Sequence, residues 1–381
     1  MTLLRRLLAI WLALGLVACG ATPPSVTAIS PSPSSPPTAT YGPTPTLTIT
    51  PSATPSPTPT PIARITTAER ALFNGDYDQA RAEYRAALND STDASLRAAA
   101  LWGLGRVEFL DGNHLAALEA LRQLISDYPD SHFAAYAHFL LGETYMAMKR
   151  YREAADAYAA YQRLRPGLID GYAHERHGDA AFAAGDYDEA LKAYRDALQS
   201  PRLGDDAQLK IKIAQTHAAI GDYANALTLY DEVAASTTND FVKARVDYLA
   251  GQALLKLGQS EEAYQRYLHA VENYPLAYDT YLALIELVDA DVPVDEFQRG
   301  LVDYFAGQYD VALAAFDRYL ASTDEPDATV YYYRGLTLRA LQRYDEAIAS
   351  WDTLITTYPN NRYWSEAWAE KAYTQWAYQE Y

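Results

Sequence analysis

The hydrophobic residues of positions 62–381 follow one pattern that repeats at intervals of 35 to 37 residues, with a single interval of 49. Each unit has a small residue, an alanine twelve positions later, and a bulky apolar residue four positions after the alanine. Residues four apart lie on one face of a helix, so the pattern predicts pairs of packed antiparallel helices. The alanines are Ala80, Ala117, Ala154, Ala190, Ala226, Ala263, Ala312 and Ala347.

The predicted turns between paired helices carry their own signals. In the segment 185–190 (GDYDEA), the glycine supplies the positive φ that ends the first helix, and the aspartate caps the second. Six prolines follow the predicted second helices, at points where a helix cannot continue. We therefore expect residues 62–381 to form an all-α, right-handed solenoid of about eight helix hairpins plus a partial ninth.

Two places break the repeat. The 49-residue interval holds about twelve extra residues, which predict an additional helix near 276–290. At the other break, the pattern stops after the first helix of a ninth unit, where Trp364, Trp368 and Trp376 are large and apolar. Because solenoids normally close with a polar capping helix, we expect the chain to be a fragment or its last helix to dock on another protein. We favour the fragment.

The repeat resembles the tetratricopeptide repeat over nearly all of residues 62–381. Segments 128–131 (YPDS) and 141–145 (LGETY) are similar to the long-repeat version in outer-membrane assembly lipoproteins and Tol–Pal coordinator proteins. The run YDTYLAL at 278–284 is similar to the superhelical, non-catalytic arm of soluble lytic murein transglycosylases. These resemblances imply a helical scaffold that binds a partner in the cell envelope, or the arm of such an enzyme.

The N-terminus predicts export. Arg5 and Arg6 precede an uncharged run, 7–17, which is too short to span a membrane but fits the core of a signal peptide. Leu-Val-Ala-Cys at 16–19 resembles the lipobox of bacterial lipoproteins. This resemblance implies that residues 1–18 are removed and that the Cys19 thiol carries a lipid, which would anchor the protein at the extracytoplasmic face of a membrane.

A spacer is expected between the lipid and the repeats. Residues 20–61 contain 13 of the 20 prolines and 18 serines or threonines, too few apolar groups to offset the entropy of ordering. We expect residues 19–61 to be a disordered stalk, extended by its polyproline-II tendency.

The amino-acid composition argues against several classes of binding partner and site. Lys+Arg total 31 against 49 Asp+Glu, a net charge of −18 that becomes about −20 (29 − 49) once residues 1–18 are removed. An acidic chain without a basic cluster is a poor match for phosphate backbones, so we expect no nucleic-acid partner. With Cys19 as the only cysteine, neither an intramolecular disulfide nor a cysteine-ligated zinc site is available.

Candidate chemistry is sparse. His174, His177 and Asp179 are the best metal candidates, but the histidines are three apart, whereas the two-histidine zinc motif needs a spacing of four. The sequence has no phosphate-binding loop or nucleophile elbow, and the Glu-Ser pair of lytic transglycosylases does not occur. We expect no catalytic residue, metal or cofactor in these 381 residues, and therefore no enzyme.

The remaining candidate is the surface lined by the first helices, whose inward positions are rich in aromatic residues. Flat rings would suit an extended peptide or a glycan strand, although many of them could instead pack between adjacent helices. The candidate groove residues are Trp102, Phe109, Tyr136, Phe139, Glu143, Phe182, Tyr248, Tyr304, Tyr332, Tyr373 and Trp376.

The sequence therefore predicts a non-enzymatic, lipid-anchored scaffold that binds a protein or a peptidoglycan strand in the bacterial cell envelope. The alternative is the N-terminal superhelical region of a peptidoglycan lytic transglycosylase, whose catalytic domain would lie beyond Tyr381.

Overall fold

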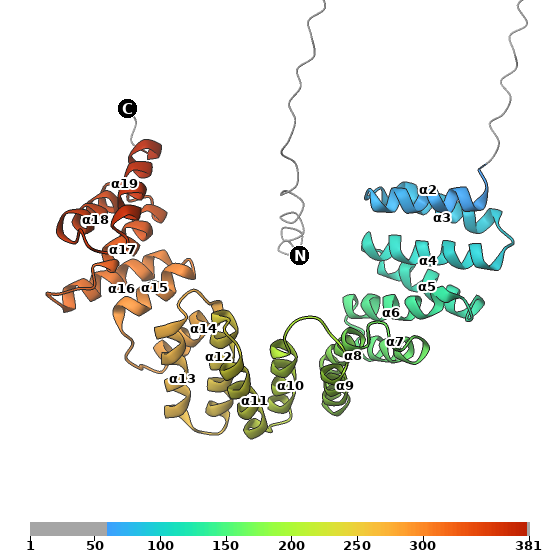
Figure 1. Cartoon of the computed structure of the whole chain (residues 1–381), viewed down its shortest axis with the longest axis horizontal. Coiled ribbons are helices and arrows are strands. Elements are labelled where there is room, and N and C mark those ends of the chain that lie inside the picture. Colours follow the sequence, from blue (N-terminus) through green and yellow to red (C-terminus); the bar gives the residue numbers. More distant parts are fainter. Residues whose placement is uncertain (1–58, 379–381) are drawn as a thin grey trace, which may run out of the picture. The chain divides into compact units, whose positions relative to one another are not determined.

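The structure is a computed structural model that describes residues 59–378. The predicted signal peptide, Cys19 and most of the predicted spacer lie outside these residues. Within them the chain forms 18 α-helices and no strand, which confirms the predicted all-α solenoid (Figure 1). The helices form eight hairpins, one single helix between the sixth and seventh hairpins, and a last helix in the position of a ninth first helix.

The helix bounds follow the repeat. The first helices are α2 (Pro61–Phe73), α4 (Ala94–Leu110), α6 (His132–Ala147), α8 (Asp170–Ala184), α10 (Ala207–Ala219), α12 (Asp240–Lys256), α15 (Glu296–Phe305) and α17 (Thr329–Ala340). The second helices are α3 (Tyr77–Asp90), α5 (His114–Asp127), α7 (Tyr151–Leu164), α9 (Tyr187–Gln199), α11 (Tyr223–Ser236), α13 (Ser260–Asn273), α16 (Tyr309–Ser322) and α18 (Tyr344–Thr357). The single helices are α14 (Tyr278–Asp289) and α19 (Trp364–Tyr378).

The hairpin turns have the geometry that the sequence predicts. Gly185 has a φ of 81°, and its N–H donates to the carbonyls of Ala181 and Phe182 at the end of α8. The Asp186 carboxylate then accepts a hydrogen bond from the Glu189 N–H and caps α9. Positive φ at this position is a glycine conformation, because an L side chain would crowd the backbone there.

A close contact between a glycine and a large residue joins the two helices in six of the eight hairpins. In α6 and α7, the ring of Tyr158 lies directly over Gly142, and a Cβ at position 142 would lie 2.5 Å from the ring. The same pairing joins Gly178 to Tyr194 and Gly335 to Trp351. Because the glycine has no side chain, the two helices approach closely and the large residue packs in a buried position against it.

Stacking of successive hairpins builds the rest of the molecule. Each second helix packs on the next first helix, as α3 packs on α4, and several neighbouring first helices pack side by side, such as α4 with α6 and α10 with α12. The buried side chains of the described residues form a series of local clusters along the chain. We call the side lined by the first helices the first-helix face, and it is there that the sequence places the candidate groove.

Candidate functional site

Several predicted groove residues are part of the packing between hairpins. Tyr332 is only 9% exposed and stacks on Tyr363 of the next unit with ring centroids 4.4 Å apart. Phe139 is half-buried and contacts the rings of Tyr158 and Tyr161, at 5.5 and 5.3 Å. The packing between helices therefore occupies both rings, as the sequence leaves open.

Glu143 has a structural role that the sequence does not reveal. Its carboxylate accepts a hydrogen bond of 2.6 Å from the Tyr158 hydroxyl and two, of 2.7 and 2.6 Å, from Arg176 of the next hairpin. Burial and the nearby Glu143 carboxylate raise the pKa of the Tyr158 phenol, and the hydrogen bonds that Arg176 donates to Glu143 raise the pKa of Arg176. Tyr158 and Arg176 therefore both stay protonated at neutral pH, as donors to this network.

The same chain of phenol, carboxylate and cation occurs in two other hairpins. Tyr84 donates to Glu69, which also accepts from Arg106 of the next hairpin. Tyr194 donates to Asp179, which accepts from Lys212 at 2.7 Å. In each case the carboxylate follows the small residue of the first helix, so it faces both its own hairpin and the next one.

A half-buried aromatic group lies on α4 and α6. The ring of Trp102 is 6.2 Å from Phe133 and 6.0 Å from Tyr136, and Arg165 lies over Tyr136 at 4.6 Å. Arg106 lies over the other side of the group, 5.9 Å from the Trp102 ring. The ring contacts join the neighbouring first helices α4 and α6, the cation–π contacts add to them, and part of each ring stays accessible.

Other candidates lie near the turns or on neighbouring helices. Phe109, Phe182 and Tyr304 each contact the residue that begins the following second helix, at 5.9, 5.5 and 5.9 Å respectively. Tyr248 contacts Tyr267 at 5.9 Å. The most exposed candidates, Tyr373 at 52% and Trp376 at 69%, are both on α19.

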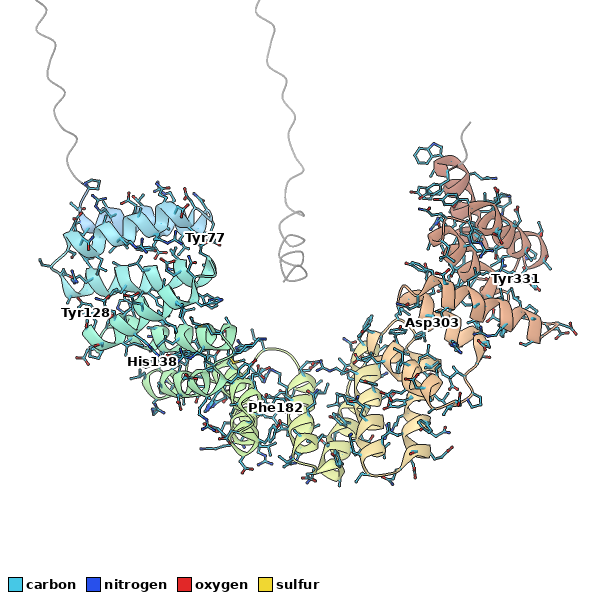
Figure 2. All side chains as sticks on the ribbon, turned by 180° about the vertical axis from the view of Figure 1, so that it is seen from behind. Tyr77, Tyr128, His138, Phe182, Asp303 and Tyr331 are labelled. Atoms are coloured by element: carbon cyan, nitrogen blue, oxygen red, sulfur yellow. The ribbon has the colours of Figure 1, made fainter. Side chains whose placement is uncertain are left out.

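The structure brings a subset of the first-helix face together around a cavity of about 540 Å³. Phe182 of α8 (Figure 2) lines this cavity together with residues of α10, α11, α12 and α14. We call this cavity the central groove. Its lining includes Phe182, Gln215, Ala219, Tyr230, Gln252, Lys256 and Glu286.

Most polar groups in the central groove lack a protein partner, although the Gln252 amide donates a hydrogen bond to the Tyr248 hydroxyl at 2.8 Å. Gln215 and Gln252 occupy the position that carries the carboxylate in the three networks above, directly after the small residue of the first helix. An amide there does not engage the phenol, and the hydroxyl of Tyr230, a residue only 2% exposed, makes no hydrogen bond to any described residue. Burial raises the pKa of Tyr230 to about 12, so the hydroxyl remains a donor at neutral pH.

The central groove also contains one cationic and one anionic side chain. Lys256 and Glu286 both line it, and within residues 59–378 neither takes part in an ion pair. Together with the two amides and the Tyr230 hydroxyl, they offer donors and acceptors between apolar walls, which is how peptide and small-molecule sites are built. Sequence reasoning missed these residues, and the signal that could have found them is the change from acid to glutamine in two consecutive repeats.

The metal candidates are engaged in other contacts. His177 Nε2 lies 2.8 Å from Glu189, and Asp179 binds Tyr194 and Lys212. Burial lowers the pKa of His174, which favours its neutral form. Among the described residues, no three histidine, cysteine or acidic side chains lie in an arrangement that could hold a metal ion.

The helical fold, the glycine turns and the aromatic rings packed against glycines define a repeat protein of paired helices. The tetratricopeptide repeat family matches residues 65–132, 175–240 and 297–362, and further tetratricopeptide repeat matches cover 135–167 and 245–277. The chain belongs to the tetratricopeptide repeat family. Among the described residues, no helix is both long enough and apolar enough to cross a membrane.

Among curated proteins, the chain is 31% identical over 247 residues to a TPR repeat-containing protein of Treponema pallidum (strain Nichols). The alignment covers 55% of this chain but only 30% of that relative. Among solved structures, it is similar to a tetratricopeptide repeat protein from Parabacteroides merdae, with 14% identity, a TM-score of 0.45, and coverage of 73% of this chain and 98% of the other. It is also similar to PilW, a type IV pilus biogenesis factor, with 18% identity, a TM-score of 0.42, and coverage of 59% and 98%.

Proposed function

We propose that this protein is a scaffold of the bacterial cell envelope that binds a protein partner in the central groove. The observation that carries the proposal is the set of polar groups in that groove without a protein partner, above all the Tyr230 hydroxyl beside Gln215. In three other hairpins, the protein itself supplies a partner for the equivalent phenol. A bound molecule would supply it here.

An extended peptide fits these groups best. A carboxamide has one acceptor and two donors, which match the C=O and N–H of a peptide backbone. Neighbouring helix axes are about 8–10 Å apart, the length of about three residues of an extended chain, so Gln215 and Gln252 could bind one strand at two points. Lys256 and Glu286 would then select a segment with a carboxylate near one and a basic group near the other.

The location in the envelope rests on the N-terminal sequence. The proposed signal peptide of 1–18 would deliver the chain across the membrane, the lipid on Cys19 would anchor it, and the proposed stalk of 19–61 would hold the solenoid away from the surface. A stalk of this composition could extend about 130 Å at ~3.1 Å per residue. The partner would then be a protein that lies well beyond the lipid headgroups.

The anchor is tested by metabolic labelling with palmitate. The wild-type chain should incorporate the label and remain with the membrane fraction, and Cys19→Ala should do neither. Because Cys19 is the only cysteine, no other thiol can substitute for it. Equal labelling of both proteins would contradict the anchor.

The groove is tested by affinity capture from envelope extracts, with purified peptidoglycan sacculi as a parallel ligand. We expect the wild type to retain a protein that the double variant Gln215→Ala/Gln252→Ala loses. Gln265→Ala, which changes an exposed glutamine on second helix α13, is the matched control and should retain it. Binding to sacculi that is lost in the double variant would instead favour a glycan ligand.

A further inference from the structure

The single helix α14 lacks the second helix that every hairpin has. It packs on α12 and α13 as a first helix does, and α15 then begins the next hairpin. The second helices have 13 or 14 residues, but only the six residues 290–295 connect α14 to α15. An extended segment is much thinner than a helix, whose diameter is about 10 Å, so the space beside α14 is only partly filled.

Apolar side chains mark this space. Ile285 and Val288 of α14 are 38% and 37% exposed, and Val311 of α16 is 42% exposed. They surround a cavity of about 170 Å³ that also contacts Asp303 and Arg299 of α15. We call this site the slot and define it by Ile285, Val288, Asp303 and Val311.

Asp303 in the slot is a buried carboxylate without a hydrogen-bond partner. It is 4% exposed, and its Oδ2 accepts no hydrogen bond from any described residue. The Nε of Arg299, one turn earlier on α15, lies 3.8 Å from Asp303 Oδ2, which is too far for a hydrogen bond. Arg318 of α16 is bound to Glu296 by two hydrogen bonds of 2.8 Å. The remaining charge at the site is Asp289 of α14, which is also acidic.

Two other hairpins show what normally satisfies this position, which lies nine residues before the repeat alanine. Glu108 accepts hydrogen bonds from Arg81 and Arg85 of α3, the second helix that precedes it. Tyr145 accepts hydrogen bonds from Arg122 of α5, again the preceding second helix. The helix that would supply an arginine to Asp303 is the one missing beside α14.

We propose that the slot is a second docking site, which binds an amphipathic helix of a partner protein. The helix lies where a second helix would lie, covers Ile285, Val288 and Val311 with its apolar face, and places an arginine against Asp303, which is labelled in Figure 2. A helix, and not an extended peptide, is the expected occupant, because each of the eight hairpin first helices is followed by a second helix. The orphaned carboxylate selects an arginine over an acidic or uncharged residue.

The probe for this proposal can be taken from the chain itself. Helix α3 performs the proposed role beside α4, so we use a synthetic peptide of residues 76–91, which includes the capping residues. A hydrocarbon staple replaces Asp78 and Ala82, both exposed, because a short free helix is marginal in water. Fluorescence anisotropy with the purified solenoid measures its binding.

We expect saturable binding that weakens about tenfold or more when the protein carries Asp303→Asn or Val311→Asp. A peptide with Arg81→Gln and Arg85→Gln should lose the same affinity, and its binding should not depend on Asp303. Leu115→Asp, which alters an even more exposed apolar residue on α5, is the control and should bind like the wild type. Circular dichroism confirms that each variant folds.

Absence of saturable binding at ~1 mM peptide would overturn the proposal, and so would binding that Asp303→Asn leaves unchanged. The test is independent of the central groove. The double variant Gln215→Ala/Gln252→Ala should bind the stapled peptide normally, so failure of one site is distinguishable from failure of the other.

Discussion

The ring of Tyr158 lies so close to Gly142 that a Cβ at position 142 would come within 2.5 Å of the ring carbon Cε1. The ring cannot easily move away, because its hydroxyl is bound to Glu143, which is bound in turn to Arg176. The contact inside one hairpin is therefore linked to the contact between two hairpins.

Replacing Gly142 by alanine should destabilise the protein. Overpacking of a buried contact costs about 1–3 kcal/mol, which exceeds the ~1 kcal/mol that alanine gains over glycine in a helix. Gly105→Ala is the matched control, since its neighbour is the flexible Leu121 at the same distance of 2.5 Å. Denaturant unfolding should show a larger loss for Gly142→Ala. Equal stability of the two variants would contradict the role of the pinned ring.

Removal of a tyrosine hydroxyl should change the unfolding free energy in a hairpin where that hydroxyl is hydrogen-bonded, but not in the hairpin where it has no partner. Tyr158→Phe removes the bond to Glu143 and should cost about 0.5–1.5 kcal/mol of unfolding free energy. Tyr230→Phe removes a hydroxyl that has no partner among the described residues, so it should change stability little. If Tyr230→Phe cost as much as Tyr158→Phe, the central groove would not hold the unpaired group on which the proposed function rests.

Asp303 makes the stability depend on pH in a defined direction. Burial raises its pKa from the ordinary value of 3.8 to about 6, against the opposing effects of Arg299 and Arg318 and with a small contribution from Glu296. The folded state thus binds the proton more tightly than the unfolded state. This stabilisation is complete below about pH 4 and is lost as the pH rises through 6.

Asp303→Asn removes that dependence. The variant and the wild type should have similar stability near pH 4, and the variant should become more stable above pH 6, by up to about 3 kcal/mol. Thermal unfolding across this range measures the difference, with Asp289→Asn, an exposed acid of α14, as the control. A constant difference between variant and wild type at every pH would show that Asp303 is not the group that titrates.

The sequence predicts the repeat because each unit is built from contacts within about sixteen residues. Gly142 and Tyr158 belong to one hairpin, and their spacing alone indicates two helices in contact. The 49-residue interval likewise predicts an extra helix where α14 lies. Local contacts of this kind appear in the order of the residues and need no knowledge of the fold.

Contacts between hairpins are harder to foresee. The burial of Tyr332 depends on Tyr363, 31 residues later, and the fate of Glu143 depends on Arg176, 33 residues later. Both were predicted to line a groove, because the repeat position indicates the face of a helix but not which neighbour covers it. The glutamines of the central groove were missed for a related reason, since an amide carries no chemical signal unless the carboxylate that it replaces is known.

We propose that the groove between α10 and α12 binds a partner, and site-specific photo-crosslinking in the producing cells tests this proposal most directly. A benzophenone side chain at Ala219, which is exposed and lines the groove, is compared with one at Ala224, which is exposed on second helix α11. We predict that position 219 crosslinks to one segment of a single envelope protein, that Gln215→Ala/Gln252→Ala abolishes the adduct, and that position 224 gives none. Identical adducts at both positions, or no adduct at 219, would contradict the binding of a partner in the central groove.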